Sequence, residues 1–255
     1  GGLDYVQLHG VGGVQLVLLR SLADFKKGNF TPEYAKSIGD KLRENGIRVP
    51  ILGCYINPSD ANEESLNESL DYFIENLHYA KYIGAEMVGL ETCRFSDDDE
   101  INNSEETYQY LLKNMKKLVS AAEEIGVNVG IEGVHFHVIN TPTKMKRLVD
   151  DLNSPNVRVI FDPVNYINTA NYKNQDEIIN THFDLLGEKT KLLHLKDFKL
   201  VDGEVAYEFP CDGLLNKDLL WDKLKQYNPD IAVILEEVKE DHLAQVKAAV
   251  EKRFV

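Results

Sequence analysis

Four apolar segments of this chain end in side chains that can bind a metal ion. The segments are "VNVGIE" (127–132), "NVRVIFD" (156–162), "KLLHLK" (191–196) and "IAVILEE" (231–237), which carry Glu132, Asp162, His194 and Glu236 at or near their ends. Gathering four ionisable groups at one apolar edge costs roughly several kcal/mol for each unpaired charge, and a bound divalent cation removes that cost. Three carboxylates and one imidazole suit Mn²⁺, Mg²⁺ or Co²⁺, and Zn²⁺ less strictly.

The spacing within the last of these segments favours one of two adjacent glutamates. Successive side chains of a strand point to opposite faces, so Glu236 shares a face with Ile234 while Glu237 does not. By the same rule Lys196 lies on the face of His194. We therefore expect Glu236 to be the metal ligand of its segment.

The elements that must position these residues alternate between strands and helices. Short runs rich in Val, Ile and Leu, typical of strands buried on both faces, occur at 47–56, 85–91, 127–132, 156–162, 191–196 and 231–237. Helical spacing predicts helices at 64–83, 104–125, 142–152, 174–187, 215–227 and 240–252, with Ser104 and Thr141 as N-caps and Gly126 as a stop. This alternation predicts parallel strands with crossover helices, as in an open doubly wound sheet or a (β/α)8 barrel.

The N-terminal part departs from this alternation. Two runs, "LDYVQL" (3–8) and "VQLVLLR" (14–20), both have strand composition, yet only a short glycine-rich segment separates them. Neighbouring parallel strands need a crossover of about a dozen residues. The first β/α unit is therefore predicted to be irregular or incomplete, with 3–8 as a poor candidate for an eighth strand. No linker is visible, so residues 1–255 are predicted to form a single domain.

Composition and charge exclude several classes of function. The formal net charge is −14 and no extended Lys/Arg cluster occurs, which disfavours nucleic-acid binding. No apolar run approaches the ~20 residues that span a bilayer, and the segment "GGLDYVQLHG" lacks the pattern of an export signal. The three cysteines form no C-x-x-C pair, so we expect a reducing, cytoplasmic location without a membrane partner.

At the four strand ends the chain resembles the sugar phosphate isomerase/epimerase family, which has the xylose-isomerase-like TIM barrel. The segments "GIEGVHFHV", "VIFDPVNYIN", "LLHLKDF" and "VILEEV" are similar to the metal-site segments of that family, in the same order, and the likeness extends over about 14–250. The resemblance implies a (β/α)8 TIM barrel. It also favours a homodimer, because barrels of this kind often pair.

The resemblance further implies a mechanism. A single divalent metal ion, with Mn²⁺ preferred, would be held by Glu132, Asp162, His194 and Glu236, and the substrate would be a small carbohydrate or its phosphate. As in ketose 3-epimerases, Glu132 and Glu236 would form the acid/base pair that moves a proton through a cis-enediolate. Aldose–ketose isomerisation uses the same intermediate, so the sequence leaves isomerase and epimerase open.

One position departs from the family. Relatives often have D-x-x-H after the strand that ends at Asp162, whereas this chain reads "DPVN", with Asn165 in place of the histidine. An asparagine can hydrogen-bond a substrate hydroxyl but is a poor metal ligand. Together with the acidic charge, this disfavours an endonuclease IV-like function, which needs additional zinc ligands.

Further residues are candidates for substrate binding. Glu91 ends the strand at 85–91, and His137 lies just past Glu132; His137 matches the family position better than His135 does. Lys196 is expected to neutralise a substrate oxyanion or phosphate, or to pair with Asp197 or a ligand carboxylate. Glu91, His137, Asn165 and Lys196 are the predicted substrate-binding set.

Two loops are open to more than one interpretation. The segment "SDDDE" (96–100) is acidic, but it lacks the spacing of an EF-hand and is better explained as a solvated loop. The segment "DGLLNKD" (212–218) either presents amides to an anion or simply begins a helix.

Two other functions remain open on the same residues. A dehydratase acting on an inosose-like polyol would use the same metal site, with His137 or Lys196 as the acid. A non-catalytic barrel that binds a sugar would have little use for two glutamates able to act as bases.

Overall fold

The computed structural model describes residues 12–254, which divide into two compact units. Unit 1 comprises the chain up to Glu132 together with 136–138 and 147–158, and unit 2 comprises 133–135, 139–146 and the chain from Val159 onward. The predicted strand at 3–8 lies outside the described residues. No helix among residues 12–254 is both long and apolar enough to cross a membrane.

Unit 1 is built on four parallel strands, β1 (Gly13–Leu16), β2 (Arg48–Gly53), β3 (Met87–Glu91) and β4 (Asn128–Glu132), which lie in the order β1-β2-β3-β4. The pairing of β3 with β4 is regular over five residues. The pairing of β1 with β2 shifts register between Gly13 and Gln15. The first strand pair of unit 1 is therefore irregular, and the prediction of an incomplete first β/α unit, which involves residues 3–8, stays a prediction.

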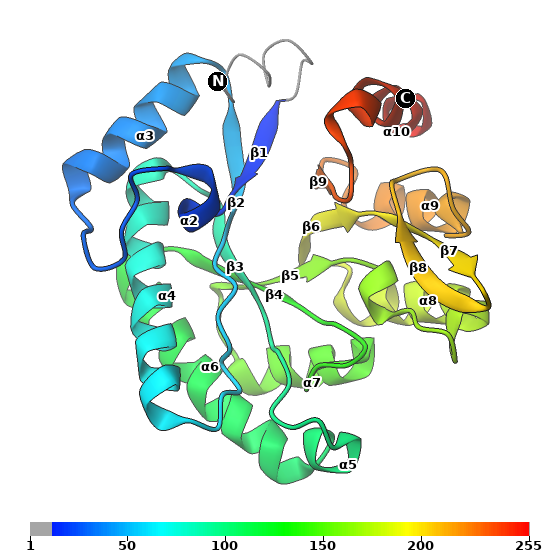
Figure 1. Cartoon of the computed structure of the whole chain (residues 1–255), viewed down its shortest axis with the longest axis horizontal. Coiled ribbons are helices and arrows are strands. Elements are labelled where there is room, and N and C mark those ends of the chain that lie inside the picture. The colour runs from blue at the N-terminus through cyan, green and yellow to red at the C-terminus, as the bar shows by residue number, and fades with distance from the viewer. Residues whose placement is uncertain (1–11, 255) are drawn as a thin grey trace. The chain divides into compact units, whose positions relative to one another are not determined.

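The three longer helices of unit 1 lie along one side of these strands, and its two short helices stand in the connections after β1 and β3 (Figure 1). They are α2 (Leu18–Ser21), α3 (Pro32–Glu44), α4 (Glu63–Ile83), α5 (Asp99–Asn102) and α6 (Glu105–Ile125). Ser104 caps α6 by accepting a hydrogen bond from the amide of Thr107, and Gly126 ends it in a left-handed conformation with φ +81°. Both caps confirm the sequence prediction.

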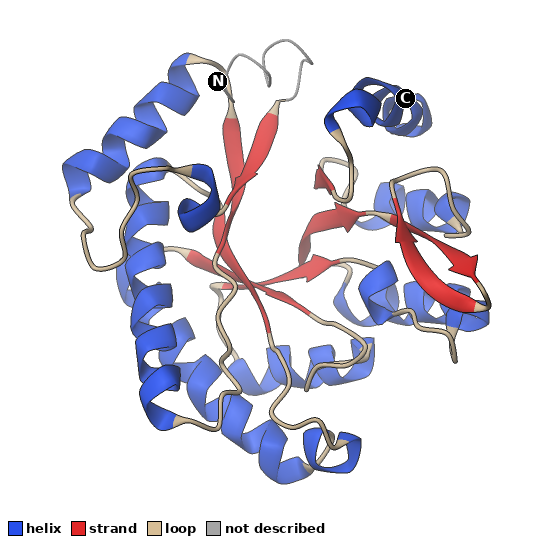
Figure 2. Ribbon diagram, in the orientation of Figure 1, coloured by secondary structure: helices blue, strands red, loops and turns tan. Residues whose placement is uncertain are grey.

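Unit 2 contains three strands that pair in parallel, β5 (Val157–Phe161), β6 (Thr190–Leu195) and β9 (Ala232–Leu235), in the order β5-β6-β9. A two-stranded antiparallel hairpin, β7 (Asp197–Val201) and β8 (Glu204–Glu208), follows β6 directly (Figure 2). β5 starts within unit 1, and its last three residues belong to unit 2. The carboxyl ends of β5, β6 and β9 thus carry three of the four predicted ligands.

The helices that pack in unit 2 are α8 (Gln175–Leu186), α9 (Lys217–Tyr227) and α10 (Leu243–Phe254). α7 (Pro142–Leu152) begins in unit 2 and ends in unit 1, and Thr141 caps it by accepting from the amide of Lys144 at 3.2 Å. The core of unit 2 is apolar, with Phe161, Phe183 and Trp221 among its buried side chains.

The strand and helix order predicted from 47 onward is confirmed, and three details are corrected. The run 14–20 is not one strand, because β1 ends at Leu16 and Arg20 lies in α2. Helix α3 was not anticipated; its residues have many polar side chains and only a narrow buried face. The β7–β8 hairpin was also missed, because it follows β6 after a single residue. The prediction of a single domain stays a prediction.

His182 of α8 is a fully buried histidine in the core of unit 2. Its ring stacks on Phe161 with centroids 3.6 Å apart, and its Nε2 lies 2.9 Å from Thr190 Oγ1. Since the Thr190 hydroxyl donates to the Leu186 carbonyl, Nε2 carries the proton in this contact. Burial lowers the pKa of His182 to about 3.

This histidine should make the protein sensitive to acid. Below about pH 6.5 the unfolded chain gains a proton at His182 that the folded chain does not, so the free energy of unfolding falls as the pH falls. Between pH 6.5 and 5 the loss from this group is about 1.5 kcal/mol. His182→Phe keeps the stacking and should remove that part of the pH dependence in urea unfolding. An unchanged slope in the variant would contradict the assignment.

Candidate functional site

Glu236 and His194 meet at the carboxyl ends of two neighbouring strands of unit 2. Glu236 follows β9 directly, and its amide donates to the Leu195 carbonyl at 2.9 Å, which extends the pairing with β6 by one residue. His194 is buried, and its Nδ1 lies 3.2 Å from Glu236 Oε1. At Glu237 the backbone turns with φ +56°, which ends the strand geometry. Of the two adjacent glutamates, Glu236 is therefore the one that contacts His194.

Asp162 ends the third strand of this group, β5, and is fully buried. Its Oδ1 accepts from the amides of Val164 at 2.8 Å and Asn165 at 3.1 Å, so the turn "DPVN" wraps around the carboxylate. These bonds hold Oδ1 in place and leave Oδ2 directed to Lys196.

The ammonium of Lys196 links the two carboxylates. Its Nζ lies 2.8 Å from Asp162 Oδ2 and 3.2 Å from Glu236 Oε2, and it also stands 4.7 Å from the centroid of the Tyr207 ring. Lys196 is 4% exposed, so the two carboxylates are neutralised by a buried cation rather than by solvent. Among the expected partners of Lys196, the structure selects the ligand carboxylates over Asp197.

The donor set of unit 2 fits a divalent cation chemically. Two carboxylates and one imidazole converge from three neighbouring strands, and a cationic group already lies between the carboxylates. Within residues 12–254, however, no group of three or more His, Cys, Asp or Glu side chains is arranged so that it could hold a metal ion. A metal ion that uses Asp162 and Glu236 therefore has to displace Lys196 Nζ from at least one of them.

Three further predicted residues, Glu91, Glu132 and His137, lie in unit 1. Glu91 and Glu132 are register partners at the ends of β3 and β4, so the two glutamates stand side by side in the sheet. His137 Nε2 lies 3.8 Å from Glu91 Oε2, and the His137 side chain is 7% exposed. The structure thus brings Glu91 near both Glu132 and His137, and the fourth predicted ligand lies beside a predicted substrate-binding residue.

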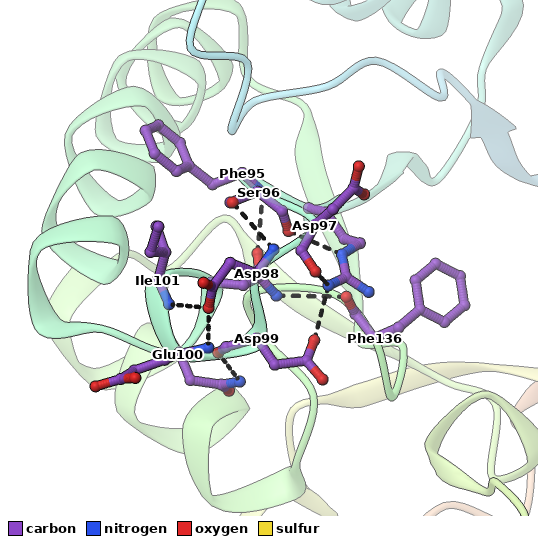
Figure 3. A network of polar contacts seen from close by, with 11 residues as sticks. Phe95, Ser96, Asp97, Asp98, Asp99, Glu100, Ile101 and Phe136 are labelled. Atoms are coloured by element: carbon purple, nitrogen blue, oxygen red, sulfur yellow. Dashed lines mark hydrogen bonds and ion pairs between the residues drawn. The ribbon is translucent and has the colours of Figure 1, made fainter.

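The acidic segment at 96–100 has a structural role in unit 1 (Figure 3). Asp98 caps α5 by accepting from the amides of Glu100 and Ile101, and Asp99 accepts from Arg94 at 2.7 Å. The guanidinium of Arg94 also donates to the carbonyls of Ser96 and Asp97. These contacts give the segment a structural role as a loop that caps and begins α5, in place of a metal site.

Asn165 and His135 lie together in unit 2. The His135 amide donates to the Asn165 carbonyl at 2.6 Å. Asn165 is buried, with 5% of its surface exposed. The backbone of Asn165 therefore supports both Asp162 and the segment around His135. Its role in substrate binding stays a prediction.

Sequence reasoning missed the contribution of Asp197. This fully buried carboxylate accepts bonds from three backbone amides, which belong to Phe198, Gly213 and Leu215, and from Lys217 Nζ. A signal was present in the sequence, because an aspartate directly after a buried strand and the glycine-containing segment 212–218 each point to a polar contact. Nothing in the sequence indicated that Asp197 contacts the segment 212–218.

Comparison with known proteins identifies the family. The family model described as xylose isomerase-like TIM barrel matches residues 3–253. The chain belongs to this family and has its fold, a barrel of parallel strands and helices, which confirms the predicted fold class and resemblance. No curated protein sequence matches the chain.

Solved structures with the same fold carry several activities. The IOLI protein with a bound zinc atom is 18% identical, with a TM-score of 0.75 over 99% of this chain and 91% of that one. D-psicose 3-epimerase in the presence of D-fructose is 16% identical, with a TM-score of 0.72 over 100% and 92%. The probable 3-DHS dehydratase AsbF from Bacillus anthracis is 12% identical, with a TM-score of 0.75 over 98% and 92%. At these identities the likeness establishes the fold alone.

The pairing of Lys196 with Asp162 can be tested by removing the cation. Lys196→Met leaves a buried carboxylate without its partner, so in the presence of a chelator the free energy of unfolding should fall by about 3 kcal/mol. Adding Asp162→Asn should recover most of that loss, and Mn²⁺ should stabilise the single variant more than the parent. Urea unfolding of all three proteins measures both effects.

Lys199→Met is the matched control for this measurement. Lys199 is half exposed and pairs with Glu208 at the surface of the hairpin, where an ion pair contributes little. If Lys196→Met costs no more stability than Lys199→Met, the buried pair does not contribute as described.

Proposed function

We propose that this protein is a metal-dependent carbohydrate isomerase or epimerase that works through a cis-enediolate. The observation that carries the proposal is the contact network at three neighbouring strand ends, in which Lys196 pairs with Asp162 and Glu236 while His194 contacts Glu236. Two structural relatives support an enzyme of this class. One is named D-psicose 3-epimerase, and the other is the IOLI protein with a bound zinc atom.

Asp162, His194 and Glu236 would hold the ion, with Glu132 as the fourth ligand expected from the family. When bound, a divalent ion supplies positive charge that acidifies the C–H beside a substrate carbonyl and stabilises the enediolate. Zinc in one relative makes a divalent ion a reasonable cofactor, and Mn²⁺ remains the specific prediction for this chain.

The proton would be moved by the two glutamates. Glu236 is one quarter exposed at its side chain, unlike the fully buried Asp162, so it can reach both a ligand position and a substrate. In this proposal one of Glu132 and Glu236 abstracts the proton and the other returns it. Return to the same carbon from the opposite face inverts that carbon, whereas return to the neighbouring carbon exchanges aldose and ketose.

Lys196 would serve the substrate once a metal ion occupies the carboxylates. Its ammonium already contacts the face of Tyr207, a partner that does not compete with a metal ion. From there the ammonium can neutralise a developing substrate oxyanion. Glu91 and His137, which lie 3.8 Å apart in unit 1, would bind substrate hydroxyls.

A dehydratase is the second candidate, because one structural relative is named a probable dehydratase. It would begin with the same proton abstraction and then expel a hydroxyl β to the carbonyl. His137 or Lys196 would protonate the leaving hydroxyl. The cytoplasmic location and the homodimer stay predictions.

Exchange with solvent distinguishes these reactions. The Mn²⁺-loaded protein should introduce deuterium from D₂O beside the carbonyl of a ketose, and a chelator should abolish the exchange. Glu132→Gln and Glu236→Gln should each lower the exchange rate about 10³-fold, because each removes a base or acid. NMR identifies the labelled carbon, which separates epimerisation from isomerisation, while loss of water from inosose would indicate the dehydratase.

Glu237→Gln is the matched control, since it removes a carboxylate from the adjacent position where the backbone has already turned. It should retain exchange within about twofold of the parent. Equal losses in Glu236→Gln and Glu237→Gln would show that Glu236 has no special role, and the absence of exchange with every ketose tested would count against the proposed function.

A further inference from the structure

Asp197 is held by a set of donors of the kind that proteins use to bind phosphate. Its Oδ1 accepts from the amides of Phe198 at 2.9 Å and Leu215 at 2.8 Å. Its Oδ2 accepts from the amide of Gly213 at 2.9 Å and from Lys217 Nζ at 2.8 Å. Two of these amides come from the loop that leads into a helix, and together with the Phe198 amide and the lysine they form a donor set, here called the nest, of the kind that binds anions.

The nest lies where the sequence suggested an anion site. Segment 212–218 leads into the eleven-residue helix α9 and was expected either to present amides to an anion or to begin the helix. The amide of Asn216 is bonded to Gln175 Oε1, and that of Leu219 is bonded to the capping oxygen of Asn216. The amides that could receive a ligand here are therefore bonded within the protein.

The fit of the carboxylate in the nest is close. Asp197 is fully buried, and a Cβ added at Gly213 would lie 2.6 Å from Asp197 Cγ, nearer than any side chain can approach. Such a Cβ would lie nearer still to the Phe198 carbonyl oxygen, so glycine at 213 makes room for both the Asp197 carboxylate and the Phe198 backbone. This is the close approach that a bound phosphate also demands of a glycine-containing loop.

The lysines that flank Asp197 in sequence, and the lysine that contacts it, are also paired. Lys196 contacts Asp162 and Glu236, Lys199 contacts Glu208, and Lys217 contacts Asp197 and the Gly213 carbonyl. A phosphate ester entering at the end of β6 would therefore meet carboxylates whose cations are already engaged, and it would have to displace one of them.

We propose that Asp197 acts as a built-in anion that fills a phosphate-type nest beside the candidate site, so that the carbohydrate taken there is unphosphorylated. The statement about the nest rests only on contacts within the chain, whereas the statement about the carbohydrate rests on the proposed function. Removing the carboxylate should open a site for a free phosphate ion, because the four donors of the nest would remain.

The nest is tested with inorganic phosphate. For the unmodified chain, Tm in phosphate should equal Tm in chloride at matched ionic strength. Asp197→Ala should be less stable than the parent in chloride and should gain about 3 °C when phosphate reaches about ten times its Kd. Phosphate stabilisation of the parent equal to that of the variant, or no response of a folded variant, would overturn the assignment.

Asp184→Ala provides the matched control. Asp184 also accepts from a lysine, Lys223 at 3.1 Å, but it is 62% exposed at its side chain and the contact is at the surface. The variant removes the same charge without emptying a nest, so phosphate should not stabilise it. A phosphate response as large as that of Asp197→Ala would mean that the gain reflects overall charge, and it would refute the nest.

The substrate class is tested with matched sugars on the unmodified chain. In the deuterium exchange assay a free ketose should have a kcat/KM at least about tenfold above that of its terminal phosphate, and equal or faster exchange of the phosphate would refute the inference. This comparison uses the unmodified chain, so it tests whether the substrate is unphosphorylated even if Asp197→Ala does not fold. Absence of exchange with both sugars would instead refute the proposed function, and the phosphate responses would still report on the nest.

Discussion

The structure of unit 2 depends on finding partners for the ionisable side chains that are buried where β6 ends. His194, Lys196 and Asp197 follow one another within four residues, and each is less than 5% exposed. A buried polar or charged group without a partner destabilises a protein by roughly one to several kcal/mol, so each of these groups has to find partners from other elements. Those partners come from the ends of β5 and β9 and from the start of α9, and they tie these elements to β6.

The two sets of contacts have different consequences. The Lys196 ammonium between Asp162 and Glu236 is a pairing that a divalent ion can replace, because the ammonium has a further partner in Tyr207. The Asp197 carboxylate is held by four donors and has no comparable alternative. The contacts of Lys196 therefore suit a site that changes during function, whereas the contacts of Asp197 suit a fixed support next to that site.

Much of the fold could be predicted because the local signals were strong. The strands of β3 to β6 are nearly continuous apolar runs, and helices such as α6 have caps and stops in the sequence. Helix α3 and the β7–β8 hairpin were missed for a physical reason. Both are largely exposed, so burial leaves only a weak pattern in their residues. The short strand β1 was overestimated because its apolar run continues into α2.

The sequence by itself determined which residues could do chemistry. Acidic and histidine side chains at strand ends, together with the family resemblance, were enough to select Asp162, His194 and Glu236, since strand alternation is a local property. Only the tertiary structure decided which partners those charges have. The choice between Asp197 and the ligand carboxylates for Lys196, and the filling of the 212–218 nest by Asp197, depend on contacts between residues up to 40 positions apart. Such contacts depend on how strands and loops pack, which no local pattern specifies.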